Sequence, residues 1–186
     1  MRFGHFGVIV SIFLKVSALA FPQAEVPGWA FAPEFAFRLP EGWKVLGRSE
    51  KKGIGYEIFA GLDGRTNARF FFSGHDLPQS EFLTRMQQVV SAERAKALRA
   101  EVLPFGKEGV RLHLEKRTRY KGTDAFEVIS PLAIGGKGLD VHVVAPWKDR
   151  EKAKLWHAEL MSSLKLYWVS DAIPNDHGAS RPKKPE

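Results

Sequence analysis

The chain of 186 residues contains no cysteine. Without cysteine there can be no disulfide, so a domain that folds outside the cytoplasm must be stabilised by its hydrophobic core alone. We also expect no bacterial lipid anchor, because such an anchor is attached to a cysteine at the new N-terminus. The chain is long enough to bury one core of its own, and we therefore expect a single domain.

The chain also lacks N-glycosylation sequons and long apolar runs. Asn67 is followed by Ala-Arg and Asn175 by Asp-His, so nothing in the sequence indicates eukaryotic secretion. The apolar run from Phe6 to Leu14 has nine residues before Lys15 interrupts it, whereas a membrane-spanning helix needs about 20. We therefore expect no transmembrane anchor.

The N-terminus does carry the features of an export signal. Arg2 supplies a basic start, the run from Phe6 to Leu14 supplies the apolar core, and Ala18-Leu19-Ala20 has the small-x-small spacing of a cleavage site. The alternatives are an uncleaved anchor and an ordinary buried helix. We expect residues 1–20 to be a cleavable signal peptide and the mature protein to be periplasmic or secreted.

The net charge is moderately positive. The whole chain has 28 Lys and Arg against 21 Asp and Glu, a formal charge of +7. Removal of Arg2 and Lys15 with the signal leaves 26 against 21, or +5. This charge favours encounters with lipid headgroups, polyanionic envelope polymers or an acidic protein. Nucleic acid is the weakest candidate, because the compartment does not contain it.

The mature chain divides into three parts. Residues 21–33 form an extended arm, because Pro27 and Pro33 disfavour a helix there. Residues 34–169 alternate between strand and helix patterns, and we assign them to the folded domain. Residues 170–186 are rich in Pro, Asp, Asn, Gly and Lys, a composition typical of a disordered tail.

The folded part has an α+β pattern. Alternating apolar and polar residues predict strands at 35–39, 43–46, 56–62, 67–72, 110–115, 125–130 and 139–145. One helix is expected from Asp76 or Ser80 to about Arg99, and another after Asp149. Because Phe70-Phe71-Phe72 is apolar on both faces of its strand, helices should cover both faces. We expect a mainly antiparallel β-sheet with helices on both faces, an α/β/α sandwich in a single domain.

Four side chains could form a metal or hydrolytic site. His113 and Glu115 share one face of their strand, and Asp140 and His142 share one face of theirs. If the same faces meet, imidazoles and carboxylates would cluster as metal ligands or acid and base groups do. The alternative is two polar faces that meet water. No Gly-x-Ser-x-Gly nucleophile motif is present, and we expect no catalytic residues and no cofactor.

The densest basic run lies at a predicted hairpin tip. It consists of Lys116, Arg117, Arg119, Tyr120 and Lys121, with Thr118 between them. A surface with this charge and one aromatic ring could bind an anionic partner. Charged hairpin tips also occur merely for solubility and to prevent strands from pairing at a sheet edge.

Two aromatic residues of the arm, Trp29 and Phe31, also have two interpretations. They could anchor a partner, or they could hold the arm against the domain's own core. The second role is the more common one for aromatics in such an arm.

The segment Leu39-Pro40-Glu41-Gly42-Trp43, with the strand before it, resembles the opening of PsbP-like domains. This group includes thylakoid-lumen PsbP and bacterial exported DcrB-type proteins. The order of strands and helices from Pro33 to Tyr167 is similar too. The resemblance implies an α/β/α sandwich and a non-catalytic role in binding or assembly, and it supplies no catalytic residue for this chain.

Three functions therefore remain open. The leading hypothesis is an exported accessory protein of the bacterial cell envelope that binds an envelope protein or an anionic component. The second is a metal-dependent or hydrolytic enzyme that uses the His, Asp and Glu residues. The third is a lipid or small-ligand carrier, which needs an apolar pocket of about 300 Å³ or more between helix and sheet.

The export signal gives a first testable prediction. When the chain is expressed in a bacterium with a general secretion pathway, the recovered protein should begin at Phe21, because Ala18 and Ala20 satisfy the cleavage rule. Intact-mass measurement of the exported protein checks this. Replacing Ala18 with a bulky Phe should block cleavage, and unchanged processing of that variant would contradict the assigned site.

Overall fold

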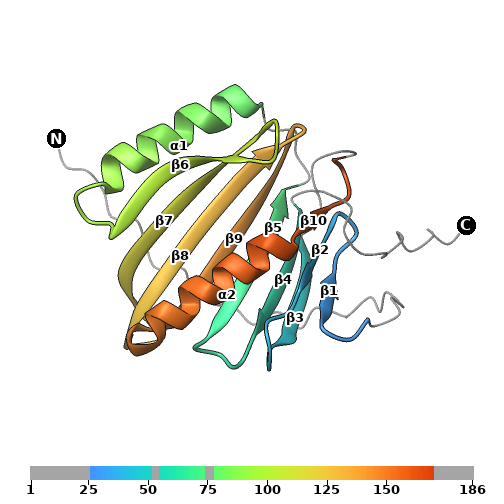
Figure 1. The fold of residues 1–186 in the computed structure, drawn as a ribbon, viewed down its shortest axis with the longest axis vertical. Helices are drawn as coiled ribbons and strands as arrows, with labels where there is room; N and C mark the ends of the chain where they lie inside the picture. The colour runs from blue at the N-terminus through green and yellow to red at the C-terminus, as the bar shows by residue number, and fades with distance from the viewer. Residues whose placement is uncertain (1–25, 52–54, 74–77, 170–186) are drawn as a thin grey trace, which may run out of the picture.

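The computed structural model describes residues 26–51, 55–73 and 78–169. Within these residues one antiparallel sheet of seven strands forms the centre of the molecule (Figure 1). Its strands, in spatial order, are β3 (Lys44–Lys51), β4 (Gly55–Gly61), β5 (Asn67–Ser73), β9 (Lys137–Pro146), β8 (Thr123–Ile134), β7 (Gly109–Tyr120) and β6 (Arg99–Phe105). A smaller sheet has the order β1 (Trp29–Phe31), β2 (Phe35–Arg38), β10 (Lys165–Leu166).

Two hairpins bring charged loops to the same region of the molecule. Between β4 and β5, Asp63 Oδ1 accepts hydrogen bonds from the backbone N–H groups of Arg65 and Thr66, at 2.6 and 2.8 Å. Between β7 and β8, the turn has only Lys121 and Gly122, with φ of 48° and 77°. Positive φ at both central residues is the geometry of a tight two-residue hairpin.

The main core lies on the face of the sheet that α2 (Arg150–Ser163) crosses, as Figure 1 shows. Strand β2 packs beside α2 on this face, where the Phe37 and Phe70 rings stack with centroids 3.8 Å apart. Both rings are fully buried. Since this core contains no disulfide, the burial of such aromatic rings supplies the main stabilisation of the fold.

The second helix, α1 (Gln79–Glu93), contacts β6, β7 and β8. Leu112 and Leu114 are buried on β7 but lie outside the main core. Leu114 pairs with Ile129, whereas Ser130, the next residue of β8, bonds to α2. Because neighbouring residues of a strand point to opposite faces, α1 covers the face away from α2. The expected single domain with a mainly antiparallel sheet and helices on both faces is confirmed.

The first helix is shorter than the sequence pattern predicts. It ends at Glu93 instead of near Arg99, and residues 99–105 form the edge strand β6. Pro104 is tolerated there because an edge strand has one side without a hydrogen-bonded neighbour. The expected cap at Asp76 lies outside the described residues, and Ser80 lies inside the helix, after Pro78.

The described part of the arm packs against its own domain. Strand β1 pairs with β2, the Phe31 side chain is buried, and the Lys165 ammonium lies 4.9 Å from the centre of the Trp29 ring. These two aromatics therefore hold the arm in place. Within the described residues, neither helix is long and apolar enough to cross a membrane.

The stacked aromatic core gives the second prediction. Replacing Phe70 with Ala should lower the free energy of unfolding by about 3–5 kcal/mol, because the change removes a fully buried ring and leaves a cavity. Urea unfolding followed by circular dichroism measures the loss. The matched control is Leu155→Ala, because Leu155 is 70% exposed. Similar losses in both variants would contradict the assigned core.

Candidate functional site

The four predicted ligands are placed by strand register on opposite faces of the sheet. Glu115 pairs with Val128, while His142 pairs with Ile129, the next residue of β8. His113 and Glu115 therefore face α2, and Asp140 and His142 face the other way. The four side chains do not converge. In the part of the chain that the structure describes, no three His, Cys, Asp or Glu side chains form a group able to hold a metal ion.

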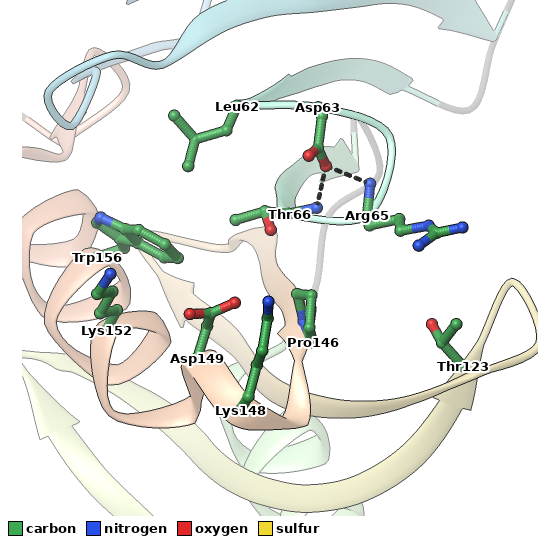
Figure 2. Close-up of a pocket in the computed structure, with 10 residues that line it drawn as sticks. All are labelled: Leu62, Asp63, Arg65, Thr66, Thr123, Pro146, Lys148, Asp149, Lys152 and Trp156. Atoms are coloured by element: carbon green, nitrogen blue, oxygen red, sulfur yellow. Dashed lines mark hydrogen bonds between the residues drawn. The ribbon is translucent and has the colours of Figure 1, made fainter.

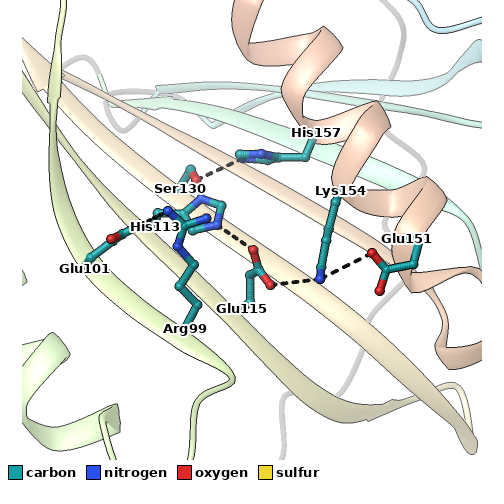
Figure 3. Close-up of polar contacts among 8 residues, drawn as sticks. All are labelled: Arg99, Glu101, His113, Glu115, Ser130, Glu151, Lys154 and His157. Atoms are coloured by element: carbon teal, nitrogen blue, oxygen red, sulfur yellow. Dashed lines mark hydrogen bonds and ion pairs between the residues drawn. The ribbon is translucent and has the colours of Figure 1, made fainter.

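On the α2 face, His113 and Glu115 belong to a buried polar cluster (Figure 3). His113 Nε2 lies 2.8 Å from Glu115 Oε1, and the Lys154 ammonium lies 3.6 Å from Glu115 Oε2. The side chains of His113 and Glu115 are 10% and 9% exposed. The carboxylate thus contacts a histidine on one side and a lysine of α2 on the other.

A second buried pair lies next to this cluster. His157 Nε2 of α2 is 2.9 Å from Ser130 Oγ, and the His157 and His113 rings are 5.4 Å apart. Burial, with smaller contributions from the charges of His113 and Arg111, lowers the pKa of His157 to about 3. The imidazole is therefore neutral at physiological pH. Ser130 has no exposed surface, so this pair is closed to a substrate in the described conformation.

On the opposite face, Glu127 joins two other predicted site residues. The Lys116 ammonium lies 3.0 Å from Glu127 Oε2, and His142 Nε2 lies 2.5 Å from Glu127 Oε1. Burial alone would raise the pKa of Glu127, but hydrogen bonds from His142 and Lys116 bring it below its ordinary value. The positive charge of Lys116 is therefore neutralised within the sheet.

Arg117 is the second cation of the basic run that already has a partner. Its Nε is 2.9 Å from Asp124 Oδ1, and its guanidinium lies 4.7 Å from the centre of the Trp147 ring. The hydrogen bonds from Arg117 hold the pKa of Asp124 below its ordinary range. Arg117 therefore joins the hairpin to η1 (Trp147–Asp149), the turn that leads into α2.

Arg119 and Lys121, at the end of the hairpin, are both exposed. Arg119 has no acidic side chain within ion-pair distance among the described residues. Lys121 lies over the Tyr120 ring, 5.5 Å from its centre, and reaches the β4–β5 loop at Gly64. Lys121 therefore adds a positive charge beside that loop, and Arg119, two residues earlier in the chain, adds a second at the same end of β7.

The loop and the start of α2 enclose a hollow of about 440 Å³ (Figure 2). Its lining residues are Leu62, Asp63, Arg65, Thr66, Thr123, Pro146, Lys148, Asp149, Lys152 and Trp156. In the described part of the chain, no ion pair holds its three cations. We name Arg65, Arg119, Lys121, Lys148 and Lys152 the basic end.

A second hollow, of about 480 Å³, lies on the other side of the first turn of α2. It is lined by Leu98, Arg99, Glu115, Phe126, Trp147, Arg150 and Lys154. Its cations have acidic partners: Arg99 pairs with Glu101, and Arg150 and Lys154 with Glu151. Charged side chains line both hollows, and only the first has an excess of unpaired positive charge.

Three members of the basic end were not among the predicted site residues. Arg65 follows the expected Asp63-Gly64 turn, and Lys148 and Lys152 stand four residues apart around the expected helix start at Asp149. Each lies next to a loop or helix start that the sequence does indicate. Their grouping depends on the order of strands in the sheet, which local patterns do not contain.

No protein-family model matches the chain, and no curated protein matches it in sequence. Solved structures do match. A protein of Bacteroides thetaiotaomicron VPI-5482 is 12% identical with a TM-score of 0.55, over 75% of this chain and 48% of that protein. This chain thus spans about half the length of that protein.

Two further solved structures are similar. Cyanobacterial PsbP (CyanoP) of Synechocystis sp. PCC 6803 is 15% identical with a TM-score of 0.51, over 80% of this chain and 98% of CyanoP. LpqN of Mycobacterium tuberculosis, described as involved in cell envelope biogenesis, is 9% identical with a TM-score of 0.48, over 73% of this chain and 86% of LpqN. The expected PsbP-like fold is confirmed. At these identities the similarity establishes the fold alone.

The buried His157 gives the third prediction. Its pKa is about 3 in the folded protein and about 6.5 in an unfolded chain. Between these values the unfolded chain binds a proton that the folded protein does not, so stability falls as the pH falls below about 6.5, by up to about 1.4 kcal/mol per pH unit.

Urea unfolding at a series of pH values measures this slope. The variant His157→Gln, which can still hydrogen-bond to Ser130, should lose this component of the slope. The control His142→Gln, on the opposite face, should retain it. An unchanged slope in His157→Gln would show that His157 is protonated in the folded state.

Proposed function

We propose that this protein is a non-catalytic binding protein of the bacterial cell envelope that contacts an anionic component through its basic end. One observation carries the proposal. The hairpin tip, the β4–β5 loop and the start of α2 together present five cations for which the described residues provide no ion-pair partner. The other cations of the basic run, Lys116 and Arg117, are neutralised by Glu127 and Asp124.

Unpaired cations gathered at one end of the sheet create a local positive potential that attracts anions and accelerates encounter. The two acidic residues beside them reduce this potential without cancelling it. Asp63 is held by the N–H groups of Arg65 and Thr66, which lower its pKa, so it stays ionised and fixes the loop. Asp149 directly precedes α2. The basic end therefore keeps a surplus of three positive charges over these two carboxylates.

The alternatives have less support from the described residues. The enzyme hypothesis needs the four His, Asp and Glu side chains in one place, and the sheet separates them into two faces. The carrier hypothesis needs apolar walls, and charged side chains line both hollows. The location in the envelope rests on the export signal in residues 1–20, which lie outside the described residues.

The fourth prediction tests the basic end. The purified protein should be retained on an immobilised polyanion such as dextran sulfate, and the salt concentration needed for elution reports the strength of binding. Arg119→Glu and Lys121→Glu should each weaken binding about fivefold, because each exposed contact contributes about 1 kcal/mol.

The matched control is Lys107→Glu. It makes the same change in net charge at the turn between β6 and β7, which lies at the opposite end of β7 from Lys121. Equal weakening by all three variants would show that net charge alone governs retention, and the proposal would fall. Crosslinking in envelope extracts, with Arg119→Glu as the comparison, then identifies the bound component.

A further inference from the structure

We propose that the anionic component is a phospholipid membrane surface, with a lipid phosphate in the hollow between the β4–β5 loop and α2. This inference rests on the proposed function and names its partner. The phosphate in this proposal belongs to the headgroups of an anionic bilayer.

The cations of the hollow come from two directions (Figure 2). The Lys148 side chain points from η1 into the space below the β4–β5 loop, and Lys152 rises one helical turn further along. Arg65, on the β4–β5 loop, points outward, away from both lysines. The Asp149 carboxylate lies between the two lysine side chains in Figure 2 and offsets part of their charge, so a phosphate would lie on the Thr66 side of Lys148. There it would receive a charge-assisted hydrogen bond from the ammonium group, which acts as a point charge and needs no fixed fork geometry.

Thr66 adds an uncharged donor. The residue is 6% exposed, and its hydroxyl faces the same space as Lys148 in Figure 2. Its backbone N–H is already bound to Asp63 Oδ1 at 2.8 Å, so the backbone of Thr66 is fixed within the loop. A phosphate has several acceptor oxygens and can therefore bind the hydroxyl and the ammonium group together.

Leu62 distinguishes a membrane from other polyanions. Its side chain is 40% exposed at the rim of the hollow, next to Asp63 and on the same loop as Arg65. Single exposed leucines are common on protein surfaces, and the position of this one beside unpaired cations is what matters. A polyanion dissolved in water has no apolar region in which a leucine side chain can be buried. The boundary between headgroups and acyl chains does have one, and burial of the side chain there is favourable.

The other wall of the hollow fits the same partner. Trp156 lines it from α2, and tryptophan is enriched where a polar surface meets hydrocarbon because its ring is apolar and its N–H is polar. The hollow thus combines cations and a hydroxyl for the phosphate with the exposed Leu62 for the upper acyl region, and Trp156, which packs against Trp43, forms its apolar wall.

This arrangement predicts two separable contributions to membrane binding. Lys148 and Lys152 act through charge, so their contribution should weaken as salt rises. Leu62 acts through burial of apolar surface, so its contribution should remain at high salt. A site for a soluble polyanion would show only the first contribution.

The test uses the purified protein and vesicles of phosphatidylcholine with or without phosphatidylglycerol, with binding measured by flotation. We expect binding only to vesicles that contain phosphatidylglycerol. Lys152→Glu should weaken it about fivefold or more at low salt, with Lys107→Glu as the charge-matched control. Leu62→Ser should weaken binding at both low and high salt, whereas Leu155→Ser should not, although Leu155 is more exposed.

The outcomes separate this inference from the proposed function. Retention on dextran sulfate without binding to anionic vesicles would overturn the lipid proposal and leave the proposed function standing. Failure in both assays would overturn both. The last experiment adds soluble glycerol phosphate to the vesicle-binding assay. If it displaces the protein from vesicles at concentrations similar to those of the lipid phosphate, the hollow is a free-phosphate site, and the membrane proposal falls.

Discussion

The packing of α2 and β2 against one face of the seven-stranded sheet is the contact on which the rest of the structure depends. The chain has no disulfide, so the stacked rings of Phe37 and Phe70 and the buried stripe of α2 provide the stabilisation that fixes the helix on the sheet. Trp156 meets Trp43 at 5.5 Å, and His157 bonds to Ser130. These contacts determine where α2 starts, and its start forms one wall of each hollow.

The neutral state of His157 is part of the same constraint. A helix that covers a sheet with one polar residue on its buried side must satisfy that residue, and Ser130 does so without a charge. Glu115 is satisfied differently, by His113 within the strand and by Lys154 from the helix. The buried polar groups His157 and Glu115 therefore both have partners within the fold, and the cations without ion-pair partners lie in the loops around the start of the helix.

Local patterns in the sequence identified many elements of this structure but not their assembly. The Asp63-Gly64 turn, the hairpin tip at Lys121 and the buried stripe of α2 follow from residues close together in the chain, and each appears in the structure. The edge strand β6 was missed because its proline is harmless only at an edge. The separation of His113 from His142 was not predictable, because the face of a strand depends on register with partners far away in sequence.

For the same physical reason, the basic run alone indicates the candidate site incompletely. In the sequence, Lys116 and Arg117 look equivalent to Arg119 and Lys121. In the structure, β8 supplies an acid to each of the first two, Glu127 and Asp124, and these pairs hold the hairpin together. Charge available to a partner is what remains after the fold has paired its own cations. Arg119 and Lys121 remain unpaired, and Arg65, Lys148 and Lys152 lie at the same end of the sheet. The five cations come together only because the order of strands places three loops side by side. The location of a binding surface in this protein therefore follows from long-range topology, and the overall charge of the chain indicates only the sign of its partner.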